Sequence, residues 1–256
     1  SYDSESYKQA LAKSCDNPTA TLRQKGDVSV ALKSASKMIS ADYYVPQLIH
    51  APMEPPAAAA HFHDGIFDIW ACTQTPQSAQ SNVAQATGVT PEKVNINVTL
   101  LGGGFGRKSK PDFVVEAALL SQKLNVPVKV LWTREDEIKN GYYHAVSYQK
   151  LSAGLDNDNK VTAWKHTEAA PTISATFAKG ADTIAFEASL GMIDMPYDIA
   201  NVYCGVGKAL AHTRIGWMRS VTNINQAFAV CSFADELAVA SETDSKEYLL
   251  LLLGKD

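Results

Sequence analysis

The feature that most constrains this chain is a glycine-rich loop that directly follows a strand-like run, Val94–Leu100. Four glycines surround a single aromatic residue, Phe105, between Leu101 and Lys108. Because glycine lacks Cβ, such a loop adopts dihedral angles that other residues avoid, and its N–H groups can approach a ligand closely. We expect the backbone of this loop to cradle an anion or a cofactor.

The loop differs from two familiar phosphate-binding loops at one position. A P-loop opening at Gly102 needs glycine where this chain has Arg107, and so does a dinucleotide-binding loop using Gly102 and Gly104. A nucleotide-binding enzyme is therefore the weakest alternative for this chain. Calorimetry that detects no binding of ATP or NAD would remove it.

Composition excludes several other classes of protein. The net charge is −4 and no block of lysine and arginine occurs, which argues against a nucleic-acid partner. The run Leu249–Leu253 is far shorter than the roughly 18 apolar residues of a membrane span. No CxxC pair occurs, so we expect no iron–sulfur or zinc site within the chain and four free cysteines.

Apolar spacing in the first half predicts helices that alternate with strands. Pro76 opens a helix that Gly88 ends, and helical spacing recurs over Pro111–Leu124. Asp27 is a plausible N-cap for a further helix. The alanine- and proline-rich stretch Ala51–Ala60 is predicted to be a tight connection. Strands are predicted at Met38–Tyr44, Ile66–Thr73, Pro91–Leu100 and Val126–Trp132, the last of them buried.

The second half is richer in strands. Two strand patterns flank Asp156–Asn159, which is a hairpin signal, and two helical patterns end the chain. The fold class is therefore α/β to α+β mixed, with a mixed sheet and flanking helices. We expect a first α/β part, 1–140, and a strand-rich part with two C-terminal helices, 141–256, with a soft boundary near Asn140–Gly141. The patterns cover Tyr148–Leu155, Val161–Ala169, Ile199–Val206, Thr222–Ala240 and Thr243–Leu253.

Five ordered segments together resemble a known family. They are similar to segments of the large molybdenum-cofactor subunit of the xanthine dehydrogenase and aldehyde oxidase superfamily, most of all in the branch of isoquinoline 1-oxidoreductase beta subunits. The resemblance implies the molybdopterin-binding fold of that superfamily. The segments are Tyr44–Pro55, Trp70–Pro76, Leu101–Lys108, Trp132–Glu137 and Gly216–Ser220.

The resemblance implies that Gln74 donates a hydrogen bond from its amide to an oxo ligand of molybdenum. It also implies that the backbone of Gly103–Gly106, above all the Phe105-Gly106 step, contacts the metal and the pterin. The alternative for Gln74 is that its side chain only caps the helix beginning at Pro76.

Two roles are open for each of two arginines. Arg107 binds a phosphate of the pterin cofactor or of its cytosine dinucleotide form, or else it is a surface residue pointing away. Arg219 orients substrate or stabilises developing negative charge, or else it forms an ion pair with Asp235 or Glu236.

Other polar segments favour structural interpretations. His50, Met53 and Glu54 are expected to form a structural turn beside the site. The alternating histidines of His61–His63 resemble a metal clip, but no third ligand is evident from spacing. The charges of Thr133–Glu137 are expected to form an ion-paired turn.

The resemblance also implies a general-base glutamate in a later glycine-rich segment. This chain ends at Asp256, and Glu236 and Glu242 lie in the wrong segments to replace that residue. We therefore expect a piece of a longer subunit that is inactive alone.

The parent enzyme would hydroxylate an aldehyde or a nitrogen heterocycle with a molybdopterin-type cofactor, and pass electrons to a small subunit carrying [2Fe–2S] clusters. Its other partners would be the rest of the same subunit and a small-molecule substrate. The alternative is a non-catalytic, cofactor-free scaffold domain with the same fold. The compartment stays open between bacterial periplasm and cytoplasm.

Overall fold

The computed structural model describes residues 2–178 and 180–254. The chain forms two compact units: unit 2 comprises Leu48–His144 and Thr213–Arg219, and unit 1 comprises the remainder. This grouping differs from the consecutive parts 1–140 and 141–256 expected from the sequence. The reason is that strand β2 (Lys37–Val45) pairs along its whole length with β7 (Ser147–Leu155), which draws the N-terminal residues into the same unit as the later strands.

Unit 1 is built on a five-stranded mixed sheet. The strand order is β1-β9-β8-β7-β2, with β1 at Ala20–Lys25, β8 at Val161–Ala169 and β9 at Asn201–Gly207. Strands β8 and β9 run parallel and the other neighbours are antiparallel. The predicted hairpin around Asp156–Asn159 joins β7 to β8.

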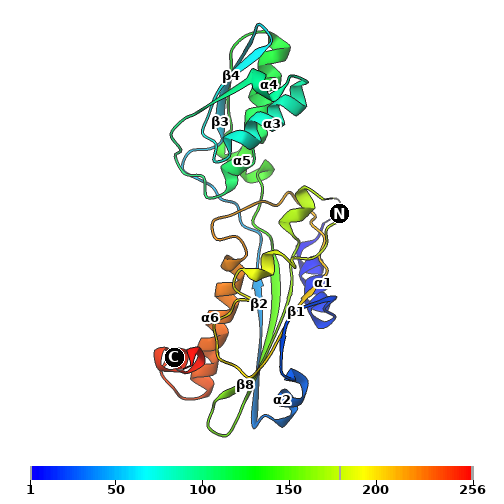
Figure 1. The fold of residues 1–256 in the computed structure, drawn as a ribbon, viewed down its shortest axis with the longest axis vertical. Coiled ribbons are helices and arrows are strands. Elements are labelled where there is room, and N and C mark those ends of the chain that lie inside the picture. Colours follow the sequence, from blue (N-terminus) through cyan, green and yellow to red (C-terminus); the bar gives the residue numbers. More distant parts are fainter. Residues whose placement is uncertain (1, 179, 255–256) are drawn as a thin grey trace. The chain divides into compact units, whose positions relative to one another are not determined.

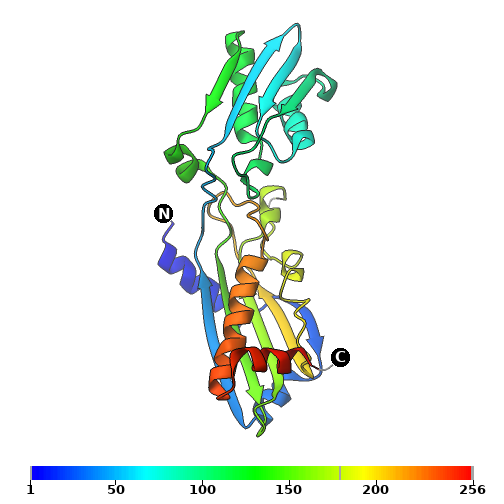
Figure 2. The same cartoon turned by 90° about the vertical axis from the view of Figure 1, so that its left-hand side faces the viewer.

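Helices cover both faces of this sheet (Figures 1 and 2). One face carries α6 (Asn223–Ala240), against which α7 (Ser245–Leu253) packs, and the core there includes Trp164 and Phe233, whose ring centroids lie 5.1 Å apart. The other face carries α1 (Ser4–Asp16) and α2 (Val28–Ser34).

Two helix caps show how far local chemistry could be predicted. Asp27 caps α2 as expected, accepting from the N–H of Val30. Helix α7 is capped by Asp244, whose carboxylate accepts from two N–H groups of the first turn. The stretch Pro171–Tyr197 contains only two short 3-10 turns, η3 (Ile173–Thr176) and η4 (Glu187–Ser189), among its described residues.

Unit 2 has a smaller mixed sheet with helices on one face (Figure 1). Its strand order is β5-β4-β3-β6. Strands β4 and β5 are parallel neighbours, and helix α3 connects them along the chain. Helices α3 and α4 bury Phe67 and Ile69 of β4 against Phe113. The bounds are β3 Ala57–His63, β4 Ile66–Ala71, β5 Val94–Val98, β6 Val128–Leu131, α3 Pro76–Thr87, α4 Asp112–Leu124, α5 Arg134–Asn140, η1 Pro91–Lys93 and η2 Arg107–Ser109.

The mixed sheets with flanking helices confirm the predicted fold class, but several local predictions were wrong. The last four residues of the expected connection Ala51–Ala60 belong to strand β3, because small alanines pack closely under α4. Strand β6 is an edge strand with two exposed residues and is not buried. The sequence patterns missed β1 and α5 entirely. Among the described residues, no helix combines the length and apolarity that crossing a membrane requires.

A carboxyl group is buried in unit 1 next to α6. Glu168 is fully buried and accepts hydrogen bonds from Ser147 (2.7 Å) and from the amide of Gln226. Burial raises the pKa of Glu168 to about 7 despite these two donors, and the carboxylate of Glu187 adds to the shift.

We expect the Glu168→Gln substitution to change how unit 1 stability depends on pH. Between pH 4.5 and about 7 the folded Glu168 holds its proton and the unfolded one does not, so its contribution to the free energy of unfolding falls as pH rises. The stability of the variant relative to wild type should therefore increase across this window and stay level above it. Urea unfolding at several pH values measures this, with Glu5→Gln at an exposed position as control. If the difference in stability between the variant and wild type does not change with pH, Glu168 does not have the raised pKa described here.

Candidate functional site

The segment before α3 is fastened to the end of the glycine-rich loop. The N–H of Gln74 and the hydroxyl of Thr73 both donate to the carbonyl of Lys108, at 3.0 and 3.2 Å. The hydroxyl of Thr75 donates to the carbonyl of Ser109 at 3.0 Å. These bonds bring residues more than thirty positions apart together within unit 2.

The loop itself has an unusual backbone path. Phe105 has a φ of +52° and Gly106 one of +96°, both in the left-handed region. A Cβ on Gly104 would lie 2.4 Å from Oε1 of Gln74, and one on Gly106 would lie 2.2 Å from the carbonyl oxygen of Trp217. Glycine is thus required at Gly106, where the neighbour is backbone, whereas a Cβ on Gly104 would displace the end of the Gln74 side chain.

The side chain of Gln74 lies against this loop in a defined orientation. Its Oε1 accepts from the N–H of Gly106 at 3.0 Å, so the oxygen must face the loop and the NH2 group must face away. Gln74 is exposed, and no described residue accepts from its NH2 group. Helix α3 begins after Thr75 without a side-chain cap, so Gln74 is not its capping residue.

Further donors surround the same loop. Among the described residues, nothing accepts from the N–H groups of Gly103, Gly104 or Phe105. The N–H of Arg219 donates to the carbonyl of Phe105 at 2.8 Å, which places Arg219 beside the loop. Arg219 is exposed, and its guanidinium forms no ion pair within the described part of unit 2. The predicted pair with Asp235 or Glu236 would join the two units and stays a prediction.

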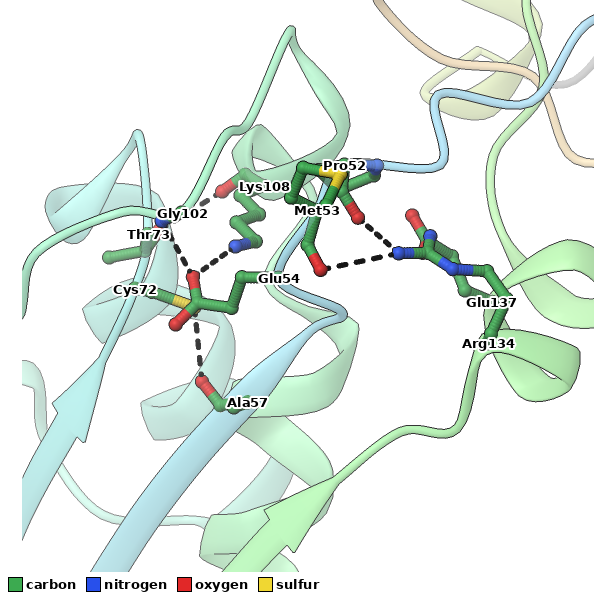
Figure 3. A network of polar contacts seen from close by, with 10 residues as sticks. All are labelled: Pro52, Met53, Glu54, Ala57, Cys72, Thr73, Gly102, Lys108, Arg134 and Glu137. Atoms are coloured by element: carbon green, nitrogen blue, oxygen red, sulfur yellow. Dashed lines mark hydrogen bonds and ion pairs between the residues drawn. The ribbon is translucent and has the colours of Figure 1, made fainter.

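The start of the loop is held by an ion pair between a buried lysine and a partly exposed glutamate (Figure 3). Lys108 is fully buried, and its Nζ lies 2.5 Å from Oε2 of Glu54. The same oxygen accepts from the N–H of Gly102 at 2.9 Å, and the N–H of Glu54 donates back to the Gly102 carbonyl at 3.0 Å. Burial alone would raise the pKa of Glu54, but the bonds from Lys108 and Gly102 hold it below its ordinary value. Glu54 thus has the structural role expected from the sequence.

A second ion pair holds the turn that precedes Glu54 (Figure 3). Arg134 pairs with the buried Glu137 and donates to the carbonyl of Pro52. Thr133 and Asp136 form a reciprocal capping box at the start of α5. The ion pair predicted within Thr133–Glu137 is confirmed, but the segment is the cap and first turn of helix α5 and not a separate turn.

Arg107 matches neither of its two predicted roles. It is fully buried, and its guanidinium makes two hydrogen bonds to the carboxylate of Asp112, at 2.9 and 3.0 Å. The same group lies over the rings of Trp132 and Tyr142, at 5.1 and 5.5 Å from their centroids. Arg107 therefore links the loop to α4 and is not placed to bind a phosphate, nor is it a surface residue.

The two histidines of β3, His61 and His63, form no metal site with the other described residues. His63 lies 2.9 Å from Asp68, and its ring contacts that of His61. No group of three or more histidine, cysteine, aspartate or glutamate side chains within the described residues could hold a metal ion. All four cysteines are free.

The site is therefore a set of hydrogen-bond donors around the glycine-rich loop. The NH2 group of Gln74 and three backbone N–H groups suit a ligand that presents oxygen acceptors or negative charge, and the backbone of Arg219 lies beside them.

The predicted residues Gln74, Gly103, Gly104, Phe105, Gly106 and Arg219 come together in this site, whereas Arg107 does not take part. Two supports of the loop were not predicted from the sequence: the hydroxyl bonds of Thr73 and Thr75, and the pairing of Glu54 with Lys108. The alternating threonines around Gln74 were a usable signal, since hydroxyl groups often bond backbone carbonyls. The partner of Lys108 could not be predicted, because it lies 54 residues away in the sequence.

Comparison with known proteins identifies one matching family and several relatives that are named as dehydrogenases or oxidoreductases. The family model "Molybdopterin cofactor-binding domain" matches residues 13–248. One component of the nicotinate dehydrogenase of Pseudomonas putida is 29% identical over 92% of this chain and 21% of its own length. The beta subunit of isoquinoline 1-oxidoreductase from Brevundimonas diminuta is 38% identical over 47% of this chain and 16% of its own length.

Solved structures agree on the fold. The aldehyde oxidoreductase from Desulfovibrio gigas superposes with a TM-score of 0.72 and 19% identity, covering 91% of this chain and 26% of that protein. The chain thus spans less than a third of the length of each of these relatives.

Proposed function

The chain belongs to the molybdopterin cofactor-binding domain family, and from this premise we propose that unit 2 supplies the cofactor-facing residues of a molybdenum hydroxylase. The observation that carries the proposal is the fixed orientation of Gln74. The N–H of Gly106 occupies its oxygen and leaves its NH2 group facing outward as a donor.

In this proposal each residue has a defined task. Gln74 donates to an oxygen of the cofactor without adding charge, and the N–H groups of Gly103, Gly104 and Phe105 orient the cofactor by further hydrogen bonds. Arg219 offers positive charge where negative charge develops on the substrate. The bound cofactor would supply the redox chemistry itself.

No described carboxylate near the loop is suited to act as a general base. Glu54 is bound to Lys108 and Gly102, and its pKa is held low, so it is a weak base. We propose that the base comes from another part of the longer subunit, and that the 256-residue chain alone shows no turnover even with added cofactor. Turnover by the chain alone would contradict this point.

The substrate class follows from the relatives' names. Two of them are named for the nitrogen heterocycles nicotinate and isoquinoline and one for aldehydes, so we propose an N-heterocycle or aldehyde as substrate. The named relatives include subunits of larger enzymes, and we propose that electrons pass to a separate subunit carrying [2Fe–2S] clusters. A cytosine dinucleotide form of the cofactor would need contacts other than Arg107, because that side chain is bound to Asp112.

A matched pair of substitutions in the full-length enzyme tests the site. Gln74→Glu keeps an acceptor for the N–H of Gly106 but replaces the outward donor by an acceptor, so the protein should fold and molybdenum content should fall by about tenfold or more. The control is Gln77→Glu, on the exposed side of α3. Metal analysis of the purified enzymes measures the effect. Equal molybdenum in both variants would contradict the role of Gln74, and a wild type without molybdenum would favour the scaffold alternative.

A further inference from the structure

The residues Thr213–Arg219, here called the return segment, belong to unit 2, although the chain on both sides of them belongs to unit 1. This segment carries Arg219 to the glycine-rich loop. The position of Arg219 therefore depends on what holds the return segment, and its two halves are held differently.

The first half is held by backbone bonds to one residue. Tyr143 donates to the carbonyl of Arg214 at 2.9 Å and accepts from the N–H of Gly216 at 3.0 Å. Tyr143 and Ile215 thereby form a parallel β-bridge. These bonds do not involve the loop.

The second half is held at two points close to the site. The Nε2 of His50 lies 2.6 Å from the carbonyl oxygen of Trp217, and the N–H of Arg219 donates to Phe105. Between them Gly106 leaves room for the Trp217 carbonyl, which a Cβ would displace. The ammonium of Lys110 also lies over the Trp217 ring, 4.3 Å from its centroid.

We propose that His50 is a positioning residue, which holds the Trp217 carbonyl so that Arg219 is presented to the glycine-rich loop. The importance of this for catalysis rests on the proposed function of Arg219. His50 itself does not touch the donors of the site, and it acts through the return segment.

The geometry sets the chemical state of His50. Its partner is a carbonyl, which can only accept, so Nε2 must carry the proton. Burial lowers the pKa of His50, with hydrogen bonding to Trp217 working in the opposite direction, so the ring is neutral at neutral pH. A glutamine at this position can offer a donor at a similar distance from the backbone, whereas leucine offers none and asparagine is too short.

Hydrogen exchange resolved to single amides by NMR tests this in the cofactor-free 256-residue chain. Two amides serve as reporters. The N–H of Arg219, which donates to Phe105, lies two residues after the Trp217 carbonyl that His50 contacts, and the N–H of Gly216 donates to the carbonyl of Tyr143. In His50→Leu we expect exchange at Arg219 to accelerate by about tenfold and at Gly216 to change little. His50→Gln should restore slow exchange, and His50→Asn, which serves if the leucine variant does not fold, should behave like leucine.

The control is His61→Leu, which removes a histidine from β3 in the same unit and should leave both reporters unchanged. Unchanged exchange at Arg219 in His50→Leu, equal acceleration at both reporters, or no rescue by glutamine would overturn the proposal. The molybdenum content and turnover of the full-length His50→Leu enzyme are measured separately, and they test the proposed function of Arg219. If exchange behaves as expected and molybdenum content and turnover stay normal, the proposed function of Arg219 fails while the positioning role of His50 stands.

Discussion

Replacing Gly106 with alanine should destabilise unit 2 by about 4 kcal/mol, because two costs add at this position. The residue has a φ of +96°, which costs a non-glycine residue about 1–3 kcal/mol. In addition, the new Cβ would lie 2.2 Å from the Trp217 carbonyl oxygen, and relieving such an overlap costs about 1–3 kcal/mol. Urea unfolding followed by tryptophan fluorescence measures the change.

Gly88 provides the matched control for this substitution. It ends α3 with a φ of +79°, but a Cβ there would meet no atom within 4 Å. Gly88→Ala should therefore cost only the dihedral strain of about 1–2 kcal/mol. If the two variants lose the same stability, the tight contact between the loop and the return segment does not exist.

Removing the carboxylate of Glu54 should also destabilise unit 2 strongly. Glu54→Leu would leave the fully buried ammonium of Lys108 without its counterion, at a cost of about 3 kcal/mol, the low end of the range for a broken buried pair because the Glu54 side chain is 36% exposed. It would also free the N–H of Gly102 at the start of the loop. The double variant Glu54→Leu/Lys108→Met removes both charges and should regain most of the loss.

The exposed pair Lys150–Asp16, 2.6 Å apart in unit 1, is the control for this cycle. Asp16→Asn should cost less than about 1 kcal/mol, because water screens that pair. The low pKa of Glu54 also gives a pH signature. Its stabilisation is present above its ordinary pKa of 4.5 and is lost as pH falls through the lower folded value. A loss of stability in Glu54→Leu no larger than in Asp16→Asn would contradict the anchoring role.

Local signals allowed much of the fold to be predicted from the sequence. Pro76 and Gly88 mark the two ends of α3, and Asp27 caps α2, because these residues act through the backbone next to them. Strand β1 was missed because its polar residues give no alternation and it is defined by pairing with β9, far along the chain.

The site also has features that the local sequence predicts and features that depend on residues elsewhere in the chain. The glycine-rich loop is a local signal, and its Phe105-Gly106 backbone has the unusual dihedral angles that the glycines suggested. The role of Arg107 could not be read locally, because it depends on Asp112, Trp132 and Tyr142 enclosing one guanidinium. An arginine beside glycines suggests a phosphate site, whereas the fold uses it to fix the loop onto α4.

The most direct test of the central claim is to locate the metal in crystals of the loaded full-length enzyme by anomalous diffraction at the molybdenum edge. The proposal predicts that the metal peak lies beside the Gln74 amide and the backbone of Gly104–Gly106, with Arg219 facing the same space. A peak elsewhere in the subunit, with Gln74 and Phe105 remote from it, would contradict it.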